Sequence, residues 1–363
     1  MMSGCFHGSD LEEIERIYGV PKDEIISFAA NVNPLGLPED FSGRMAGEIS
    51  CIERYPDREY TALRAAMGKY VNADPDMILV GNGSSELIGD VLRIREKPKA
   101  LLLSPAYSEY ERDLKLMDGD VEYFDLSEED DFICNVSELI SRLDAGYDLL
   151  VICNPLNPTS TAISRRDMEK VLDKCSGTGT ICLVDETYID FADECYDATP
   201  LCGKYECLFV IRSMSKFFCA PGLRLGYAVT SHRALRDRIN ERKDPWSVSS
   251  FAAVAGESLL CDEHFIKRSA SYVREERDRV CRALDEMRGY GLKYYSPTAN
   301  FVLCRLPEGD FDAHSLFEKA IRERMMIRDC SSFRGLDERY FRFCFMKRED
   351  DDRLLEMIRE EVL

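Results

Sequence analysis

ECLFVIRSMSKFFCAPGLRLGYAVT, residues 206–230, is the segment from which the expected architecture of this chain follows most directly. Two runs rich in apolar and β-branched residues enclose a polar loop, and such runs are typical of buried strands. Lys216 lies in that loop beside two phenylalanines, where desolvation favours the neutral, nucleophilic amine. Ser213, Ser215 and Arg224 are close enough in sequence to form an anion clamp. The alternative is an ordinary loop with a solvated lysine.

The same pattern continues on both sides of this segment. Short apolar runs alternate with stretches of helical periodicity, and turn residues follow the runs. Continuous apolar strands separated by helices predict an α/β fold with a mainly parallel sheet that is covered on both faces. Ligands bind such sheets at the carboxyl ends of the strands. The predicted strands lie within residues 77–83, 100–107, 148–160, 180–188, 206–216 and 224–230.

Two further strand ends carry polar residues. GNGSSE, residues 81–86, places Gly83, Ser84 and Ser85 between a strand and a helix, where backbone N–H groups suit a phosphate. An ordinary glycine turn with a serine helix cap is the competing interpretation. VDETY ends a buried strand with Asp185 and Tyr188, and a carboxylate at that place either serves a ligand or caps a helix.

The C-terminal part has a different rhythm, which predicts a smaller α+β unit. A long charged amphipathic helix is expected at about 262–288, followed by a helix near 312–325, the strand YFRFCF at 340–345 and a last helix from about 349. We expect an N-terminal segment over residues 1–45 that joins the small domain. We further expect a large domain over 46–275 and a small domain over 276–363.

Composition excludes several classes of function. Asp and Glu number 67 against 47 Lys and Arg, a formal charge of −20 that argues against nucleic-acid binding. No apolar run approaches the length of a membrane span, and no secretion signal is visible, so a cytoplasmic protein is expected. The 15 cysteines include no CxxC pair, and the four histidines are scattered. We therefore expect reduced thiols that fill the core, and no metal site.

Taken together and in this order, the motifs resemble those of fold-type I pyridoxal-phosphate enzymes, which have the aspartate aminotransferase type of fold. The resemblance rests on NPLNPT at 154–159, D-x-x-Y at 185–188 and S-x-S-K-x(7)-R at 213–224. More narrowly, they look like the branch that contains histidinol-phosphate aminotransferase and threonine-phosphate decarboxylase. One departure is Ser160, which stands where the NPNNPTG motif of the family ends in glycine.

The resemblance implies a role for each matching residue. Lys216 would bond covalently to pyridoxal 5'-phosphate and later carry a proton, and Asp185 would pair with the pyridine nitrogen. Tyr188 and Asn157 would bind the ring oxygen, and Tyr107 would stack on the ring. The cofactor phosphate would be held by Gly83, Ser84, Ser85, Ser213, Ser215 and Arg224, and by Tyr55 from the neighbouring subunit of a homodimer.

Several segments resemble threonine-phosphate decarboxylases in particular: HGSD at 7–10, FAANVNPLG at 28–36, DPWSVSSFA at 244–252 and MIRDCSSFRGL at 326–336. By this resemblance, Arg342 would bind the substrate carboxylate, and Arg328, His7 and Asn33 would approach its phosphate side. Asn157 would also contact the substrate. The alternative is that Arg342 faces solvent on its strand and binds no ligand. The resemblance implies decarboxylation of L-threonine O-3-phosphate to (R)-1-aminopropan-2-yl phosphate and CO2, in cobalamin biosynthesis.

Three alternatives remain beside that reading. The first is a histidinol-phosphate-type aminotransferase that uses 2-oxoglutarate and glutamate. The second is a decarboxylase for another phosphorylated amino acid, such as phosphoserine. The third is a ligand-sensing regulator, which the absence of a basic N-terminal helix-turn-helix pattern in the sequence disfavours.

Overall fold

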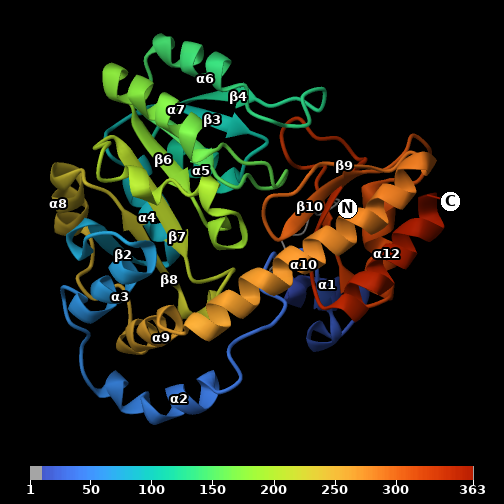
Figure 1. Cartoon of the computed structure of the whole chain (residues 1–363), viewed down its shortest axis with the longest axis horizontal. Helices are drawn as coiled ribbons and strands as arrows, with labels where there is room; N and C mark the ends of the chain where they lie inside the picture. The colour runs from blue at the N-terminus through green and yellow to red at the C-terminus, as the bar shows by residue number, and fades with distance from the viewer. Residues whose placement is uncertain (1–9, 363) are drawn as a thin grey trace.

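The larger of the sheets has seven strands and forms the centre of the protein, which is described here by a computed structural model over residues 10–362. Its strand order is β2-β8-β7-β6-β5-β3-β4 (Figure 1). The strands are β2 (Ile78–Asn82), β3 (Lys99–Ser104), β4 (Asp120–Asp125), β5 (Leu149–Cys153), β6 (Ile181–Asp185), β7 (Leu208–Ser213) and β8 (Leu225–Val229). β8 runs antiparallel to both of its neighbours, because a short loop without a crossover helix joins it to β7.

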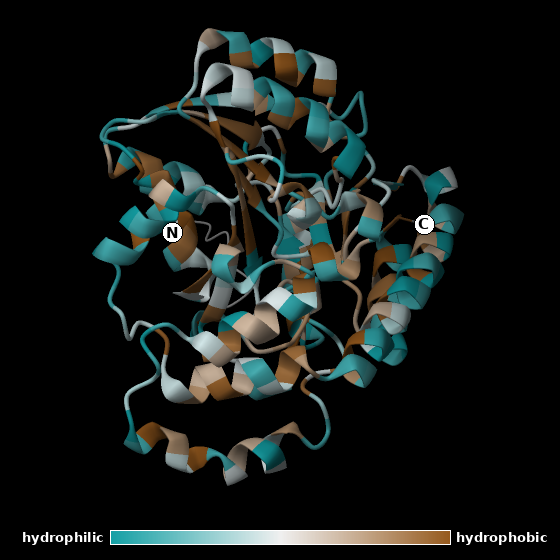
Figure 2. Ribbon diagram, turned by 60° about the vertical axis from the view of Figure 1, so that its left-hand side comes forward, coloured by the Kyte–Doolittle hydropathy of each residue, from teal (hydrophilic) through white to brown (hydrophobic). Residues whose placement is uncertain are grey.

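Except at the edge strand β4, both faces of this sheet are buried, which is why its strands read as continuous apolar runs. Successive side chains point to opposite faces, so Leu101 and Leu103 enter one core cluster and Leu102 the other. Figure 2 shows the apolar strands enclosed by helices whose outer surfaces are polar. On one face pack α3 (Thr61–Val71), α6 (Val136–Arg142), α7 (Arg165–Thr178) and α9 (Ser250–Leu260); on the other pack α4 (Gly83–Leu92), α5 (Ser108–Lys115) and α8 (Arg233–Arg242).

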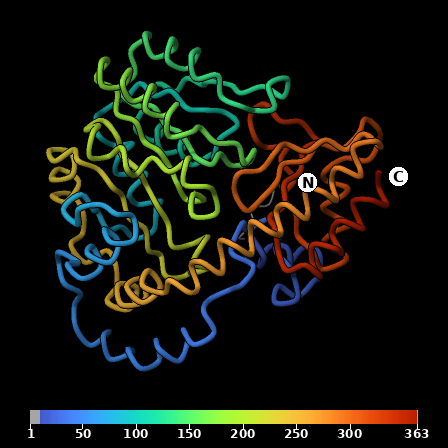
Figure 3. Tube along the Cα trace, in the orientation of Figure 1, coloured from blue at the N-terminus to red at the C-terminus, as the bar shows by residue number. Residues whose placement is uncertain are grey.

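A four-stranded sheet of order β12-β13-β10-β9 forms the second unit. Its strands are β9 (Lys293–Tyr294), β10 (Phe301–Arg305), β12 (Arg328–Asp329) and β13 (Tyr340–Cys344). The 25-residue helix α10 (Glu263–Met287) runs from the large sheet to this unit, where α11 (Ala313–Arg322) and α12 (Arg348–Val362) also lie (Figure 1). The N-terminal segment, with α1 (Leu11–Tyr18), reaches the same region, because β1 (Ile26–Ser27) pairs with β11 (Met325–Met326) (Figure 3).

The structure confirms the predicted α/β class and the two predicted C-terminal helices. The helices expected at 262–288 and 312–325 are α10 and α11. β4 is an additional strand that the sequence reading did not contain. The domain limits at 45 and 275 stay predictions. Helix α2 (Phe41–Gly47) lies below the large unit in Figure 1.

No helix within residues 10–362 is both long and apolar enough to span a membrane. The cysteines of this range carry free thiols, and most are buried in the apolar layers. The same range contains no group of three or more side chains arranged to hold a metal ion.

Candidate active site

Lys216 lies in the loop that follows the carboxyl end of β7, at one edge of the large sheet. The strand before it is buried throughout, and Phe217 and Phe218 fix the loop by packing into the core. Its Nζ donates a 2.6 Å hydrogen bond to the carbonyl of Ala30. Burial, and after it the positive charge of Arg342, lowers the pKa of Lys216 to about 8. About a tenth of the amine is therefore neutral at pH 7, far more than for a lysine of ordinary pKa, and the neutral form is the one that a nucleophile requires.

Asp185 ends β6, the strand next to β7, and is buried. One carboxylate oxygen accepts a 2.6 Å hydrogen bond from the hydroxyl of Tyr110. The other accepts bonds from the backbone N–H and the hydroxyl of Thr187, at 3.0 and 2.6 Å. Burial raises the pKa of Asp185, and no cationic side chain within residues 10–362 forms an ion pair with it. A protonated ring nitrogen is the partner that such a carboxylate lacks.

Tyr188 and Asn157 approach the same place from neighbouring strand ends. Tyr188 is buried, its ring lies edge-on to Phe301 at 4.9 Å between centroids, and burial raises the pKa of its hydroxyl. Arg342 counteracts this effect on Tyr188, and its Nη1 donates a hydrogen bond to Asn157 Oδ1. Tyr107 precedes α5, and burial raises the pKa of its hydroxyl to about 12. The charges of Asp185 and Arg224 both act on the hydroxyl of Tyr107, so the three side chains belong to the same part of the site.

A cradle for an anion forms where α4 begins beside the lysine loop. Gly83 adopts a left-handed φ of +76°, and a methyl group there would collide with the guanidinium of Arg224. Ser213 pairs with Gly226 in the sheet, and a methyl group on Gly226 would come within 2.6 Å of the backbone nitrogen of Ser84. The hydroxyl of Ser213 also accepts a 3.1 Å bond from the Ser215 backbone. These groups therefore lie close together. The Arg224 guanidinium and the first backbone N–H groups of α4 form one site for an anion. Ser85, in the same first turn, is exposed.

Arg328 and Arg342 stand directly opposite each other on β12 and β13. Both are buried, which excludes the solvent-facing alternative for Arg342. Arg342 donates to Asn157 and, at 2.8 Å, to the carbonyl of Ala29, and it lies over the ring of Phe301. No carboxylate in residues 10–362 forms an ion pair with it, so its charge is available to an anionic ligand. Arg328 donates a 2.9 Å bond to the Ser332 hydroxyl.

The structure does not place three of the predicted site residues, Asn33, Tyr55 and His7, as open ligand contacts of this site. Both amide hydrogens of Asn33 are used within the protein, on the Phe217 carbonyl and the Ser269 hydroxyl at 2.8 Å each, so a substrate contact would replace one of these bonds. Tyr55 is 82% exposed, and its ring lies against Trp246 at 5.0 Å between centroids. His7 lies outside the described residues. The ligand roles of all these residues stay predictions.

Three side chains of the site were missed by sequence reasoning. Tyr110 lies in the first turn of α5, three residues after Tyr107, and the two rings meet edge-on at 5.6 Å between centroids. Thr187 stands two residues after Asp185. Asn31 is buried, and neither its amide nitrogen nor its amide oxygen has a hydrogen-bond partner within the described chain, although it lies near the hydroxyl of Tyr188. Such an amide is costly unless a ligand or water satisfies it. The spacing in NVNP gave no means to choose between its two asparagines.

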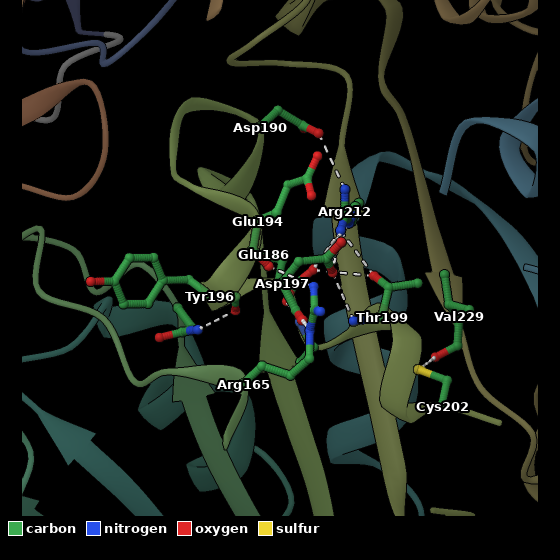
Figure 4. A network of polar contacts seen from close by, with 12 residues as sticks. Arg165, Glu186, Asp190, Glu194, Tyr196, Asp197, Thr199, Cys202, Arg212 and Val229 are labelled. Carbon is green, nitrogen blue, oxygen red and sulfur yellow. Dashed lines mark hydrogen bonds and ion pairs between the residues drawn. The ribbon is translucent and has the colours of Figure 1, made fainter. Parts of the chain in front are cut away.

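A buried charged network supports the site from behind (Figure 4). Arg212 precedes Ser213 on β7 and bonds to Glu186, Asp190 and Asp197 at 3.0, 3.2 and 2.7 Å. Glu186 directly follows Asp185, so the network joins the ends of β6 and β7 on the side facing away from the site. Three carboxylates share one guanidinium, and burial raises the pKa of Glu186 to about 8.

A nucleophilic lysine, a buried carboxylate on the next strand and an anion cradle at a helix start define a cofactor-dependent α/β enzyme. The chain belongs to the family of class I and II aminotransferases, whose model matches residues 23–358. The fold expected from the sequence, that of the aspartate aminotransferase type, is thereby confirmed, as is the enzyme class.

Three similar proteins are the following. A protein of Caldanaerobacter subterraneus subsp. tengcongensis, provisionally named threonine-phosphate decarboxylase, is 37% identical over 91% of this chain and 88% of its own length. The threonine-phosphate decarboxylase of Salmonella typhimurium is 32% identical over 97% of this chain and 95% of its own. The crystal structure of histidinol-phosphate aminotransferase from Clostridium acetobutylicum superposes with a TM-score of 0.86 at 30% identity, covering 92% of this chain and 98% of that one.

Membership in this family implies pyridoxal phosphate as the cofactor, and the residues present fit it. The cradle at Gly83 and Arg224 has no room for a side chain at the glycine and offers donors suited to a phosphate. Asp185 is a buried carboxylate without a cationic partner among residues 10–362, which suits a protonated pyridine nitrogen. Lys216 has the lowered pKa that reaction with an aldehyde requires.

Proposed function

We propose that this enzyme uses pyridoxal phosphate to decarboxylate L-threonine O-3-phosphate, giving (R)-1-aminopropan-2-yl phosphate and CO2. The observation that carries the proposal is the buried pair Arg328 and Arg342, opposite each other on adjacent strands. A substrate with both a carboxylate and a phosphate needs two cationic sockets, and planar guanidinium groups bind either anion with two hydrogen bonds. Two relatives above 30% identity bear the name of this decarboxylase. The product would serve cobalamin biosynthesis.

When bound, pyridoxal phosphate supplies an electron sink for the bond that breaks at the substrate α-carbon. Asp185 keeps the ring nitrogen protonated, and Thr187 and Tyr110 hold that carboxylate in place. Arg342 binds the substrate carboxylate and thereby sets which α-carbon bond is aligned for cleavage. Lys216 Nζ, whose pKa of about 8 allows it to hold or release a proton, returns a proton to the α-carbon.

We further propose that two copies of this chain form a homodimer with shared sites. Ile49, Ile52 and Tyr55 are exposed to 53%, 62% and 82%, a density of large apolar side chains that favours a partner surface. An apolar groove lies beside them, lined by Leu37, Phe41, Ser42, Met45, Ala46, Ile49 and Phe251. A second copy that covers this face would bring Tyr55 to the phosphate cradle of its partner.

The second candidate is a histidinol-phosphate-type aminotransferase, favoured by the likeness to the Clostridium enzyme. It would use the same lysine, carboxylate and phosphate cradle. Its amino-group exchange requires loss of the hydrogen from the amine-bearing carbon of histidinol phosphate, which carries no carboxylate, and 2-oxoglutarate becomes glutamate with both of its carboxylates retained. The two candidates therefore differ in the bond that breaks.

The test compares the two reactions on one preparation of holoenzyme. We expect turnover of L-threonine O-3-phosphate without any oxo acid, and at least 100-fold lower kcat/KM for histidinol phosphate with 2-oxoglutarate. O-Phosphoserine serves as the control for other phosphorylated amino acids, and its kcat/KM should also be lower. Turnover that requires 2-oxoglutarate and histidinol phosphate would overturn the proposal in favour of the aminotransferase.

A further inference from the structure

Ser160 ends the loop over residues 154–160 in an unusual backbone conformation. Its φ is +63°, in the left-handed region that favours glycine, and its side chain is fully buried. The motif that this loop resembles ends in glycine, so Ser160 adds a side chain and a hydroxyl where that motif has neither. A side chain retained under such strain needs compensating contacts.

The compensating contacts of Ser160 reach the second unit of the protein. Its hydroxyl accepts a 2.9 Å hydrogen bond from the backbone N–H of Ala299, and its carbonyl accepts one of 2.8 Å from the N–H of Thr298. The carbonyl of Thr298 in turn accepts a 2.6 Å bond from Arg277 on α10. Residues 298–299 are therefore held from both sides, by the loop of the large unit and by the helix that joins the two units.

The same loop contacts the small sheet at a second point, three residues earlier. There Arg342 donates to the side chain of Asn157. The segment held by Ser160 leads into β10, whose first residue, Phe301, lies 5.4 Å beneath the guanidinium of Arg342 and edge-on to Tyr188. Ser160 is therefore connected to the Arg342 guanidinium through residues 298–299 and Phe301. The same guanidinium also contacts Asn157, which lies in the loop of Ser160.

We propose that Ser160 is a positioning residue: by holding residues 298–299 against the loop of Asn157, it sets where the Arg342 guanidinium stands and so orients the substrate carboxylate for cleavage. This inference rests on the proposed decarboxylase function. Loss of the hydroxyl frees the segment to shift by a fraction of an ångström, which is enough to change the alignment of the bonds at the α-carbon. Loss of the α-hydrogen then competes with loss of CO2.

Two substitutions separate positioning from stability. Ser160→Ala removes the hydroxyl and keeps the strained backbone, whereas Ser160→Gly removes the hydroxyl and relieves the strain. We therefore expect the glycine variant to have the higher Tm of the two. Both should share the same functional defect, because both lack the acceptor for the Ala299 N–H.

The experiment measures CO2 release by holoenzyme in D2O and, by NMR, deuterium entering the α-position of recovered substrate. In both variants we expect kcat/KM for CO2 release to fall roughly 10- to 100-fold. The ratio of exchange to CO2 should rise at least fivefold. Ser164→Ala is the matched control, because it also removes a hydroxyl acceptor of a backbone N–H, at 3.2 Å from Asp167, but both partners lie at the start of α7. It should lower Tm and leave the ratio unchanged.

An unchanged ratio in both variants, or an activity that follows Tm so that Ser160→Gly behaves as wild type, would overturn the role of Ser160. Failure of the proposed function looks different, because the wild-type enzyme itself would then release no CO2. If that enzyme instead transaminates, the variants are compared on their KM for glutamate, whose carboxylate would occupy the same socket. An unchanged KM for glutamate would reject the positioning role in that reaction too.

Discussion

Replacement of Arg342 by methionine tests the carboxylate socket most sharply. Methionine fills similar space without charge, so the substrate loses a bidentate, charge-assisted contact in a buried site. Removing one member of such a buried charged pair costs about 2–5 kcal/mol, and each 1.4 kcal/mol is a factor of about ten. We therefore expect kcat/KM for CO2 release to fall by roughly 30- to 4000-fold, measured by steady-state kinetics on holoenzyme.

The same substitution has a second consequence that can be measured apart from turnover. The charge of Arg342 is one of the causes that lower the pKa of Lys216, so that pKa should rise in the variant. Amine labelling of cofactor-free protein as a function of pH reports it. Arg339→Met is the matched control, because Arg339 also bonds backbone carbonyls, those of Pro307 and Phe311, just before β13. A kcat/KM within threefold of wild type in Arg342→Met would refute the socket.

Three further predictions concern the lysine, the cradle and the network behind them. The rate at which pyridoxal phosphate loads into cofactor-free protein should rise with pH around a midpoint near 8, because the neutral amine of Lys216 is the form that reacts. A midpoint near the pKa of free lysine, about 10.4, would contradict this prediction. Gly226→Ala should weaken cofactor affinity at least tenfold in an equilibrium titration, since its methyl group would press on the backbone of Ser84; unchanged affinity would contradict the cradle. Arg212→Met should lower the free energy of unfolding, measured in denaturant, by about 3–5 kcal/mol. Glu186→Gln should lower it by only about 1 kcal/mol, because the raised pKa of Glu186 already favours its neutral form. A larger loss in Glu186→Gln than in Arg212→Met would contradict the described charge distribution.

The sequence was sufficient for six of the seven strands of the large sheet and for the order of their polar ends, because apolar runs and turn residues are local signals. β4 was missed because the prediction rested on continuous apolar runs, whereas DVEYFD alternates charged and apolar residues, as a half-exposed edge strand does. The position of Lys216 between two strands was likewise predictable from its own loop.

The rest of the site depends on contacts between distant segments. Arg328 lies opposite Arg342 because of the strand register, and no local pattern in either segment predicts that register. Asn33 and Asn31 are two residues apart, yet only the fold turns the first toward the lysine loop and leaves the second with an unsatisfied amide. The link from Ser160 to Ala299 joins residues 139 positions apart, so it too is visible only in three dimensions.

The most direct test of the account is the yield of CO2 from carboxyl-labelled L-threonine O-3-phosphate, with holoenzyme and no oxo acid present. The account predicts release over many turnovers, with one aminopropanol phosphate formed for each CO2. Release that stops at one equivalent per site would contradict it, because decarboxylation would then not be a sustained reaction of this enzyme. No release while the α-hydrogen exchanges with solvent would contradict it in favour of the aminotransferase.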